Sequence, residues 1–206
     1  MSANPVPVTT VILAGGLGTR MGGDKGLQEL HGKPLIGWVL EAVSRDSMEV
    51  LINANDMQGA YARFGYRVIA DLIPDWPGPL AGLHAALSCA QTDYVMTVPC
   101  DTPFLPDDLI ERLTAAHRLH GAEVTVAIAN GQRQPTIALY NRNVLPKLIS
   151  YLDAGKRKVN DWLNSLRVNE VVFDNTEAFD NINSKEELAK ASLKQDKLHI
   201  NDSGNS

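Results

Sequence analysis

Short apolar runs alternate with segments of helical periodicity along most of the chain. Residues 8–13 form an apolar, β-branched run that is typical of a buried parallel strand. After Pro34, apolar residues recur at helical spacing as far as residue 43. The same patterns predict further strands at 50–53, 67–70, 94–98, 123–129, 135–140 and 168–173, and further helices at 80–87, 106–120, 143–153, 158–166 and from 184.

This order of elements predicts the fold class. Strands that alternate with helices build an α/β domain with a mainly parallel sheet and helices on both of its faces. The chain has 206 residues, which is close to the roughly 150 residues of an average single domain. We therefore expect one Rossmann-like, three-layer α/β/α domain over residues 1–190. The polar composition of residues 191–206 predicts a disordered tail.

Composition and charge exclude several classes of protein. The net charge of −5 argues against a dedicated nucleic-acid binder, because such proteins carry a basic excess. The two cysteines make no disulfide framework and indicate a reducing compartment. No apolar run is long enough to span a membrane, and the first ten residues lack the pattern of a signal peptide. We expect a cytoplasmic protein with neither nucleic acid nor membrane as a partner.

A glycine-rich stretch at residues 15–26 follows the first predicted strand directly. Glycines let backbone N–H groups approach a phosphate chain closely, and Arg20 and Lys25 add positive charge to the same loop. The loop is not a dinucleotide fingerprint, because Met21 stands at the sixth position of the pattern. It is not a P-loop either, because Asp24 stands where that motif needs lysine. The stretch predicts a polyphosphate cradle of another kind.

Three polar residues lie at the ends of predicted strands. In an open parallel sheet, ligands bind beyond the carboxyl ends of the strands. Asp101 follows the 94–98 strand at this edge, and a carboxylate beside a polyphosphate is a natural Mg²⁺ ligand. Asp71 follows the 67–70 strand, so the same argument applies to it with less force. Asn53 ends the 50–53 strand and carries an amide that can read the edge of a base.

Several motifs in order make a family resemblance. The chain resembles the molybdenum cofactor guanylyltransferases (the MobA family of nucleotidyltransferases) from about residue 8 to residue 188. The motifs that carry the resemblance are Leu-Ala-Gly-Gly at 13–16, Arg-Met-Gly-Gly-Asp-Lys at 20–25, Trp-Pro-Gly-Pro-Leu-Ala-Gly-Leu at 76–83, Pro-Cys-Asp-Thr-Pro-Phe-Leu-Pro at 99–106, Gln-Pro-Thr-Ile-Ala-Leu-Tyr at 134–140, Ala-Gly-Lys-Arg-Lys-Val at 154–159 and Asn-Ile-Asn at 181–183.

The resemblance implies an activity and a set of site residues. It implies the fold of the nucleotide-diphospho-sugar transferases, with a nucleotide-binding N-terminal half and an acceptor-binding C-terminal half. GMP would pass from GTP to molybdenum-molybdopterin, with Mg²⁺ or Mn²⁺ as cofactor and pyrophosphate as the second product. Molybdenum-insertion proteins and recipient molybdoenzymes or their chaperones are further expected partners. The implied residues are Leu13, Ala14, Gly15, Lys25, Asn53, Asp71 and Asp101 for the nucleotide, Asp101 for the metal, Arg20, Lys25 and Asp101 for catalysis, and Gly78, Arg157, Asn181 and Asn183 for the acceptor.

Three alternatives share parts of this pattern. A molybdopterin cytidylyltransferase would use CTP on the same acceptor, and the base would be chosen by contacts around Ala14 and Asn53. A sugar-1-phosphate nucleotidylyltransferase has the same loop but usually a longer sugar-binding half. A regulatory module could bind GTP without chemistry, although Lys25 and Asp101 together favour an enzyme.

Overall fold

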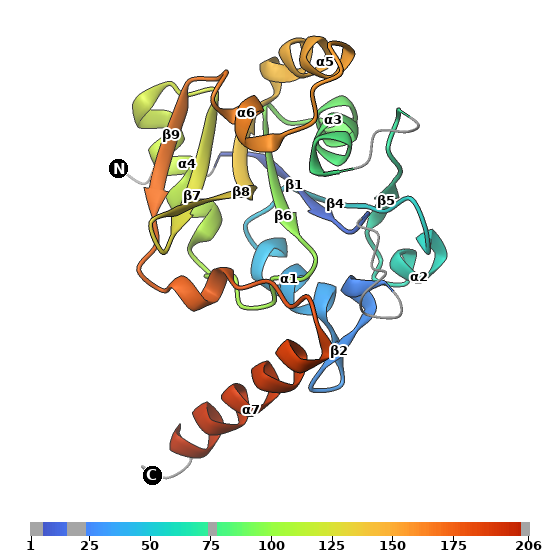
Figure 1. The fold of residues 1–206 in the computed structure, drawn as a ribbon, viewed down its shortest axis with the longest axis vertical. Coiled ribbons are helices and arrows are strands. Elements are labelled where there is room, and N and C mark those ends of the chain that lie inside the picture. Colours follow the sequence, from blue (N-terminus) through green and yellow to red (C-terminus); the bar gives the residue numbers. More distant parts are fainter. Residues whose placement is uncertain (1–5, 16–23, 74–77, 203–206) are drawn as a thin grey trace.

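The computed structural model describes residues 6–15, 24–73 and 78–202, with side chains as far as residue 193. Within these ranges the chain forms one twisted seven-stranded sheet with helices packed on both faces (Figure 1). The strands of the sheet are β1 (Val8–Leu13), β4 (Glu49–Asn53), β5 (Arg67–Ile69), β6 (Tyr94–Pro99), β7 (Val124–Ala129), β8 (Gln132–Asn141) and β9 (Val168–Val172). This architecture confirms the fold class expected from the sequence.

The spatial order of the strands is β5-β4-β1-β6-β8-β7-β9. β1 pairs in parallel with both β4 and β6, so that Val11 lies between Leu51 and Thr97. β8 is antiparallel to β6 and to β7. Its direction follows from the tight turn at Asn130 and Gly131, both of which have positive φ, as a two-residue hairpin requires.

The helices connect and cover these strands. They are α1 (Leu35–Ser44), α2 (Gln58–Ala62), α3 (Pro79–Cys89), α4 (Leu109–His120), α5 (Leu145–Asp153), α6 (Val159–Leu163) and α7 (Lys185–Asp202). Short 3₁₀ turns are η1 (Lys25–Leu27), η2 (Arg142–Val144) and η3 (Thr176–Phe179), and a small separate hairpin is formed by β2 (Glu29–Leu30) and β3 (Lys33–Pro34).

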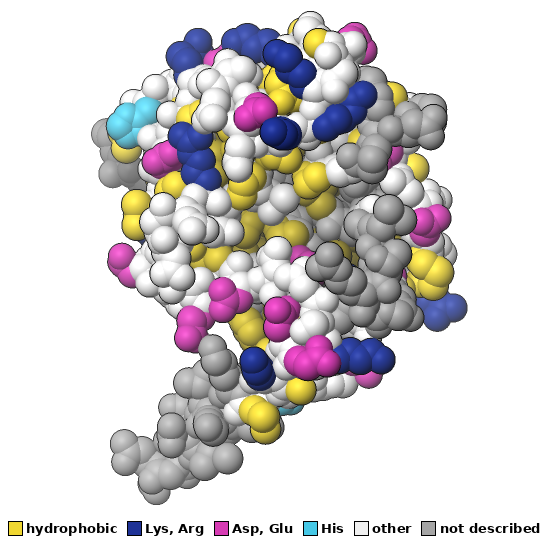
Figure 2. All heavy atoms as spheres, viewed as in Figure 1, with side chains coloured by type: hydrophobic (Ala, Val, Ile, Leu, Met, Phe, Trp, Pro, Cys, Tyr) yellow, Lys and Arg dark blue, Asp and Glu magenta, His cyan; other side chains and the backbone are white. Residues whose placement is uncertain are grey.

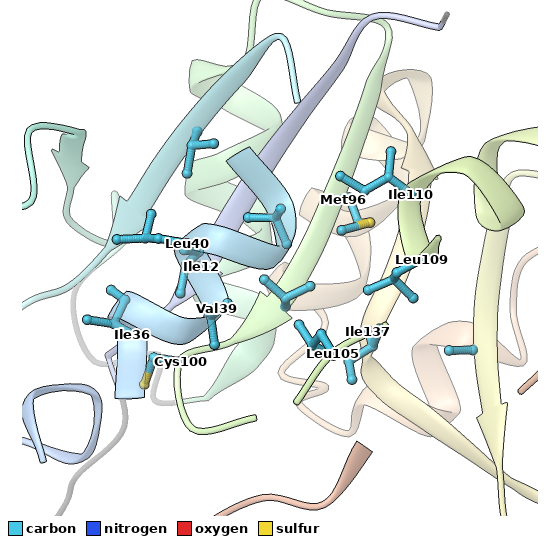
Figure 3. Packing of buried hydrophobic residues seen from close by; sticks show 14 of the residues in the cluster. Ile12, Ile36, Val39, Leu40, Met96, Cys100, Leu105, Leu109, Ile110 and Ile137 are labelled. Carbon is cyan, nitrogen blue, oxygen red and sulfur yellow. The ribbon is translucent and has the colours of Figure 1, made fainter. Parts of the chain in front are cut away.

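The core is divided by the sheet into two layers. On one face, α1 and α4 pack against strand residues such as Ile12 and Met96, as Figure 3 shows. On the other face, α3, α5 and α6 pack against residues such as Val11 and Val95. Neighbouring residues of β1 therefore serve opposite layers, because successive side chains of a strand point to opposite faces.

Some expected boundaries move. Helix α4 begins at Leu109 and not at residue 106, because Pro106 and the two aspartates after it form a turn. This turn is closed by a hydrogen bond from the N–H group of Leu109 to the carbonyl of Pro106. Helix α7 continues through residue 191 to Asp202, and the disorder expected for the tail stays a prediction. Over the described ranges, the helices are too short or too polar to cross a membrane.

Candidate functional site

The carboxyl ends of four parallel strands form the edge at which the candidate site lies. In the strand order, β1 stands between β4 and β6, and this is the point where the order of strands reverses direction. The segment Leu13–Gly15 leaves β1 here and is fastened on both sides. The N–H group of Ala14 donates to the carbonyl of Asn53 at 2.8 Å, and that of Cys100 donates to the carbonyl of Leu13 at 3.1 Å.

An amide–carboxylate cluster occupies the β4–β5 side of this edge. Asn53 is buried, and its Nδ2 donates to Oδ1 of Asp71 at 3.0 Å. Asn55 Nδ2 donates to the other oxygen of Asp71 at 2.8 Å, and Asn55 Oδ1 accepts from the N–H group of Asp71 at 2.9 Å. These bonds orient the Asp71 carboxylate, whose remaining lone pairs can accept from N–H donors of a base. Asn55 was not among the expected site residues, although it lies two residues beyond Asn53.

Glycines let helix α3 approach the same cluster. A Cβ atom on Gly82 would collide with Oδ1 of Asn53 and would lie 2.7 Å from Cδ2 of Leu13. Gly82 therefore lies with its backbone directly against the strand ends. It was expected only as part of the 76–83 motif, with no site role of its own. Gly78, expected on the acceptor side, precedes the helix with φ of 120°, a conformation that favours glycine.

Lys25 and Asp101 meet on the β6 side of the edge. Lys25 Nζ lies 3.4 Å from Oδ2 of Asp101 and donates to Oδ1 of Asn183 at 2.7 Å. Burial raises the pKa of the Asp101 carboxyl above its ordinary value, and the Lys25 ammonium opposes that shift. Thr102 Oγ1 donates to Oδ1 of Asn181 at 2.7 Å. Asn183, expected on the acceptor side, thus contacts Lys25, which is expected at the nucleotide, and Asn181 contacts Thr102, the chain neighbour of Asp101.

Asp24 holds the turn that carries Lys25. Its Oδ1 accepts from the N–H group of Gly26 at 3.2 Å and caps η1. The same oxygen accepts from the hydroxyl of Tyr61, which is fully buried. Burial raises the pKa of the Asp24 carboxyl, and the hydrogen bonds from Tyr61 and Gly26 oppose that shift. The sequence analysis gave Tyr61 no role.

The donor set near Asp101 suits a cation that arrives with a polyphosphate. Over the described ranges, His, Cys, Asp and Glu do not form a group of three or more that could hold a metal. Mg²⁺ is commonly held by one or two carboxylates together with substrate phosphates. The single buried carboxylate of Asp101, with the amide oxygen of Asn183 nearby, fits that arrangement.

A cavity of about 550 Å³ opens beside Asn181 and Asn183. It lies between the β7–β8 turn, η3 and the first turns of α7. Its lining mixes amides, acids and rings: Phe104, Asn130, Gln132, Gln134, Glu177, Phe179, Asp180, Asn181, Asn183, Glu187 and Lys190 are among its residues. Figure 2 shows several acidic side chains on the lower part of the viewed face, whereas most Lys and Arg side chains of that face lie towards its top.

Arg157 and Arg20 are the remaining residues expected in the site. Arg157 belongs to the loop between α5 and α6, where its Nη1 donates to the carbonyls of Leu152 and Lys156 at 2.8 and 2.7 Å. These two hydrogen bonds attach the Arg157 side chain to the carbonyls of the α5–α6 connection, and its role toward the acceptor stays a prediction. Arg20 lies outside the described residues.

Comparison with known proteins agrees with this geometry. Residues 10–170 match the MobA-like NTP transferase domain. The chain is 46% identical over 187 residues to the molybdenum cofactor guanylyltransferase of Cupriavidus metallidurans, covering 88% of this chain and 92% of that protein. It is 44% identical over 188 residues to the protein of the same name from Vibrio parahaemolyticus, covering 90% and 95%.

Solved structures extend the comparison to the fold. The molybdopterin-guanine dinucleotide biosynthesis protein A of Archaeoglobus fulgidus superposes with a TM-score of 0.78 at 28% identity, covering 92% of this chain and 99% of that one. The 4-diphosphocytidyl-2C-methyl-D-erythritol synthase of Anaerococcus prevotii superposes with a TM-score of 0.73 at 14% identity, covering 94% and 100%. The second likeness concerns the fold alone.

Proposed function

The chain belongs to the MobA-like NTP transferase family and, within it, to the molybdenum cofactor guanylyltransferases, and we propose that it transfers GMP from GTP to molybdenum-molybdopterin. The observation that carries the proposal is the Lys25–Asp101 pair at the strand-order switch point, where Lys25 also binds Asn183. One cation there contacts residues expected on both the nucleotide and the acceptor side.

The reaction needs no side-chain nucleophile. An oxygen of the acceptor's terminal phosphate attacks the α-phosphorus of GTP, and the bond to the bridging oxygen breaks as pyrophosphate leaves with its electron pair. Catalysis is then positioning and charge stabilisation. Lys25 and Arg20 offset the charge on the departing pyrophosphate. Cys100 takes no part as a nucleophile, because burial raises the pKa of its thiol well above the ordinary value.

The metal would be held by Asp101. We expect Mg²⁺ or Mn²⁺, which nucleotidyltransferases of this kind use with the triphosphate. When bound, the ion neutralises phosphate charge and polarises the α-phosphate. The role of the chain is to keep the Asp101 carboxylate ionised and oriented, and the neighbouring Lys25 ammonium favours the ionised form.

Guanine is expected at the β4–β5 side of the edge. The Asp71 carboxylate, oriented by Asn53 and Asn55, offers acceptors for the N1–H and amino group of guanine. Cytosine lacks that pair of adjacent donors. This contrast supports GTP over CTP as the nucleotide. We expect the nucleotide to lie over Leu13, Ala14 and Gly15, at the carboxyl end of β1.

The acceptor is expected on the other side of Lys25. Asn181 and Asn183 border the 550 Å³ cavity, and Gly78 and Arg157 are the further acceptor residues that the family resemblance implies. Molybdenum-insertion proteins, recipient molybdoenzymes and their chaperones are proposed partners for delivery and transfer. The cytoplasmic location and the expected lack of nucleic-acid and membrane partners stay predictions.

Calorimetry with each nucleoside triphosphate and Mg²⁺ is the first test of the proposal. Selective binding of GTP, weakened by Asn53→Ala, supports it, whereas selective binding of CTP indicates the cytidylyl enzyme. Pyrophosphate release in the presence of the pterin acceptor then separates an enzyme from a binding module. Asp101→Asn should lower pyrophosphate release, and Asp108→Asn is its matched control, because Asp108 is an exposed carboxylate that pairs with Arg112 of α4.

A further inference from the structure

Tyr61 is a buried polar side chain outside the residues assigned to the reaction. It lies in the five-residue helix α2, its exposed fraction is 0%, and its hydroxyl donates to Oδ1 of Asp24. A hydroxyl removed from water needs such a partner. The partner here is the residue directly before Lys25.

Gly26, the residue directly after Lys25, lies too close to its neighbours to carry a side chain without displacing them. A Cβ atom on Gly26 would lie 2.6 Å from the Tyr61 hydroxyl oxygen and 3.2 Å from Sγ of Cys100. Asp24 binds both the Tyr61 hydroxyl and the N–H group of Gly26 through one oxygen. Tyr61 therefore fixes Asp24 directly and Gly26 through Asp24, and Lys25 between them is only partly buried.

Helix α2 also connects the two sides of the site. It follows the Asn53–Asn55 segment, and the N–H group of Tyr61 donates to the carbonyl of Met57 at 3.2 Å. Gln58 Nε2 donates to the carbonyl of Ala54 at 3.2 Å. Tyr61 thus joins the segment expected at the base to the turn expected at the phosphates.

We propose that Tyr61 is a positioning residue, which acts through Asp24 and Gly26 to hold Lys25 at the triphosphate. The inference rests on the proposed function for the identity of the nucleotide. Tyr61 touches neither substrate nor metal in this role. Its effect on the reaction must therefore disappear when the Lys25 ammonium is removed.

A double-mutant cycle tests this dependence. Tyr61→Phe keeps the ring and removes the hydrogen bond to a carboxylate, so kcat/KM for GTP is expected to fall about tenfold. In a Lys25→Ala background, the same substitution should change kcat/KM by less than about twofold, because coupled residues are not additive. Tyr140→Phe is the matched control, since Tyr140 is buried in the other core layer, and it should change neither background.

The outcomes separate this inference from the proposed function. If wild-type protein binds no GTP, the proposed function is wrong. If wild-type protein turns over GTP and Tyr61→Phe costs nothing, or costs the same factor in both backgrounds, the positioning role is wrong. Should Tyr61→Phe not fold, Asp24→Ala repeats the cycle, because it removes the oxygen that accepts from the Tyr61 hydroxyl. Circular dichroism monitors the folding of every variant.

Discussion

Replacing Gly82 by alanine should destabilise the protein and weaken GTP binding, although Gly82 lies inside helix α3. Within an ordinary helix, glycine-to-alanine substitution stabilises by about 1 kcal/mol. At Gly82 the new methyl group would collide with Oδ1 of Asn53 and approach Cδ2 of Leu13 to 2.7 Å. Either the helix or the Asn53 side chain must move.

Both costs can be estimated. Overpacking of a buried contact costs about 1–3 kcal/mol. Displacing Asn53 breaks its hydrogen bond to Asp71, and an unpaired buried polar group costs about 1–3 kcal/mol. After the helical gain of about 1 kcal/mol is subtracted from the two costs together, the net loss is about 1–5 kcal/mol, and even its lower bound lowers Tm by about 2–4 °C for a chain of this size.

Gly37→Ala is the matched control, because Gly37 is also a helical glycine, in α1. A Cβ atom there meets carbon atoms of the Lys33 side chain at 3.1 and 3.2 Å, and that flexible side chain can move aside. Gly37→Ala should keep or raise Tm and leave GTP binding unchanged. Thermal unfolding and GTP calorimetry on both variants make the comparison. If Gly82→Ala raises Tm and binds GTP like wild type, the close approach of α3 to Asn53 is refuted.

Three further predictions follow from the contacts of charged residues. Asp101→Ala and Lys25→Ala should each lower kcat/KM by about 10² to 10³. Lys25→Ala should also move the acidic limb of the pH–rate profile to higher pH, because the Lys25 ammonium opposes the raised pKa of Asp101. An unmoved limb would contradict the pairing of Lys25 with Asp101. Arg157→Ala should raise KM for the acceptor more than KM for GTP, and steady-state kinetics showing the reverse would remove Arg157 from the acceptor site. The hydrogen bond from Lys147 lowers the pKa of Glu123 in the folded protein below its ordinary value of 4.5. Ionised Glu123 therefore stabilises the fold above pH 4.5, and this contribution disappears as the pH falls through the lower pKa of the folded state. Glu123→Gln should therefore lower Tm at pH 7 and converge with wild type in acid, where a constant difference would disprove the titration.

The sequence best predicts the helices and strands and the polar residues at the carboxyl edge of the sheet. Hydrophobic periodicity predicts the strands and the main helices, and the parallel-sheet rule places Asn53, Asp71 and Asp101 at one edge before any coordinates are used. The Asn-Gly pair at 130–131 is a hairpin signal that was not used, so the antiparallel direction of β8 was not anticipated. These features depend on residues that are near each other in the chain.

Contacts between distant segments leave no such local signal. The hydrogen bond from Tyr61 to Asp24 and the fit of Gly82 against Asn53 depend on how helices dock, and neither partner marks the other in sequence. Because both contacts are buried, they tolerate little change in side-chain volume, as is general in a well-packed interior. Tyr61 lies in none of the recognised motifs, and Gly82 is marked only as one residue of the 76–83 motif, so neither contact could be predicted from the sequence.

The position of Lys25 changes how the two halves of the domain are understood. The family resemblance assigns Lys25 to the nucleotide and Asn183 to the acceptor, yet the two side chains are hydrogen-bonded at 2.7 Å. Asn183 is in turn held through its N–H group by the carboxylate of Glu187, in the first turn of α7. Lys25 is thus restrained from the nucleotide side by the Tyr61–Asp24 contact and from the acceptor side by α7. An in-line transfer needs both phosphates at one point, and a lysine fastened from both sides is a means of bringing them there.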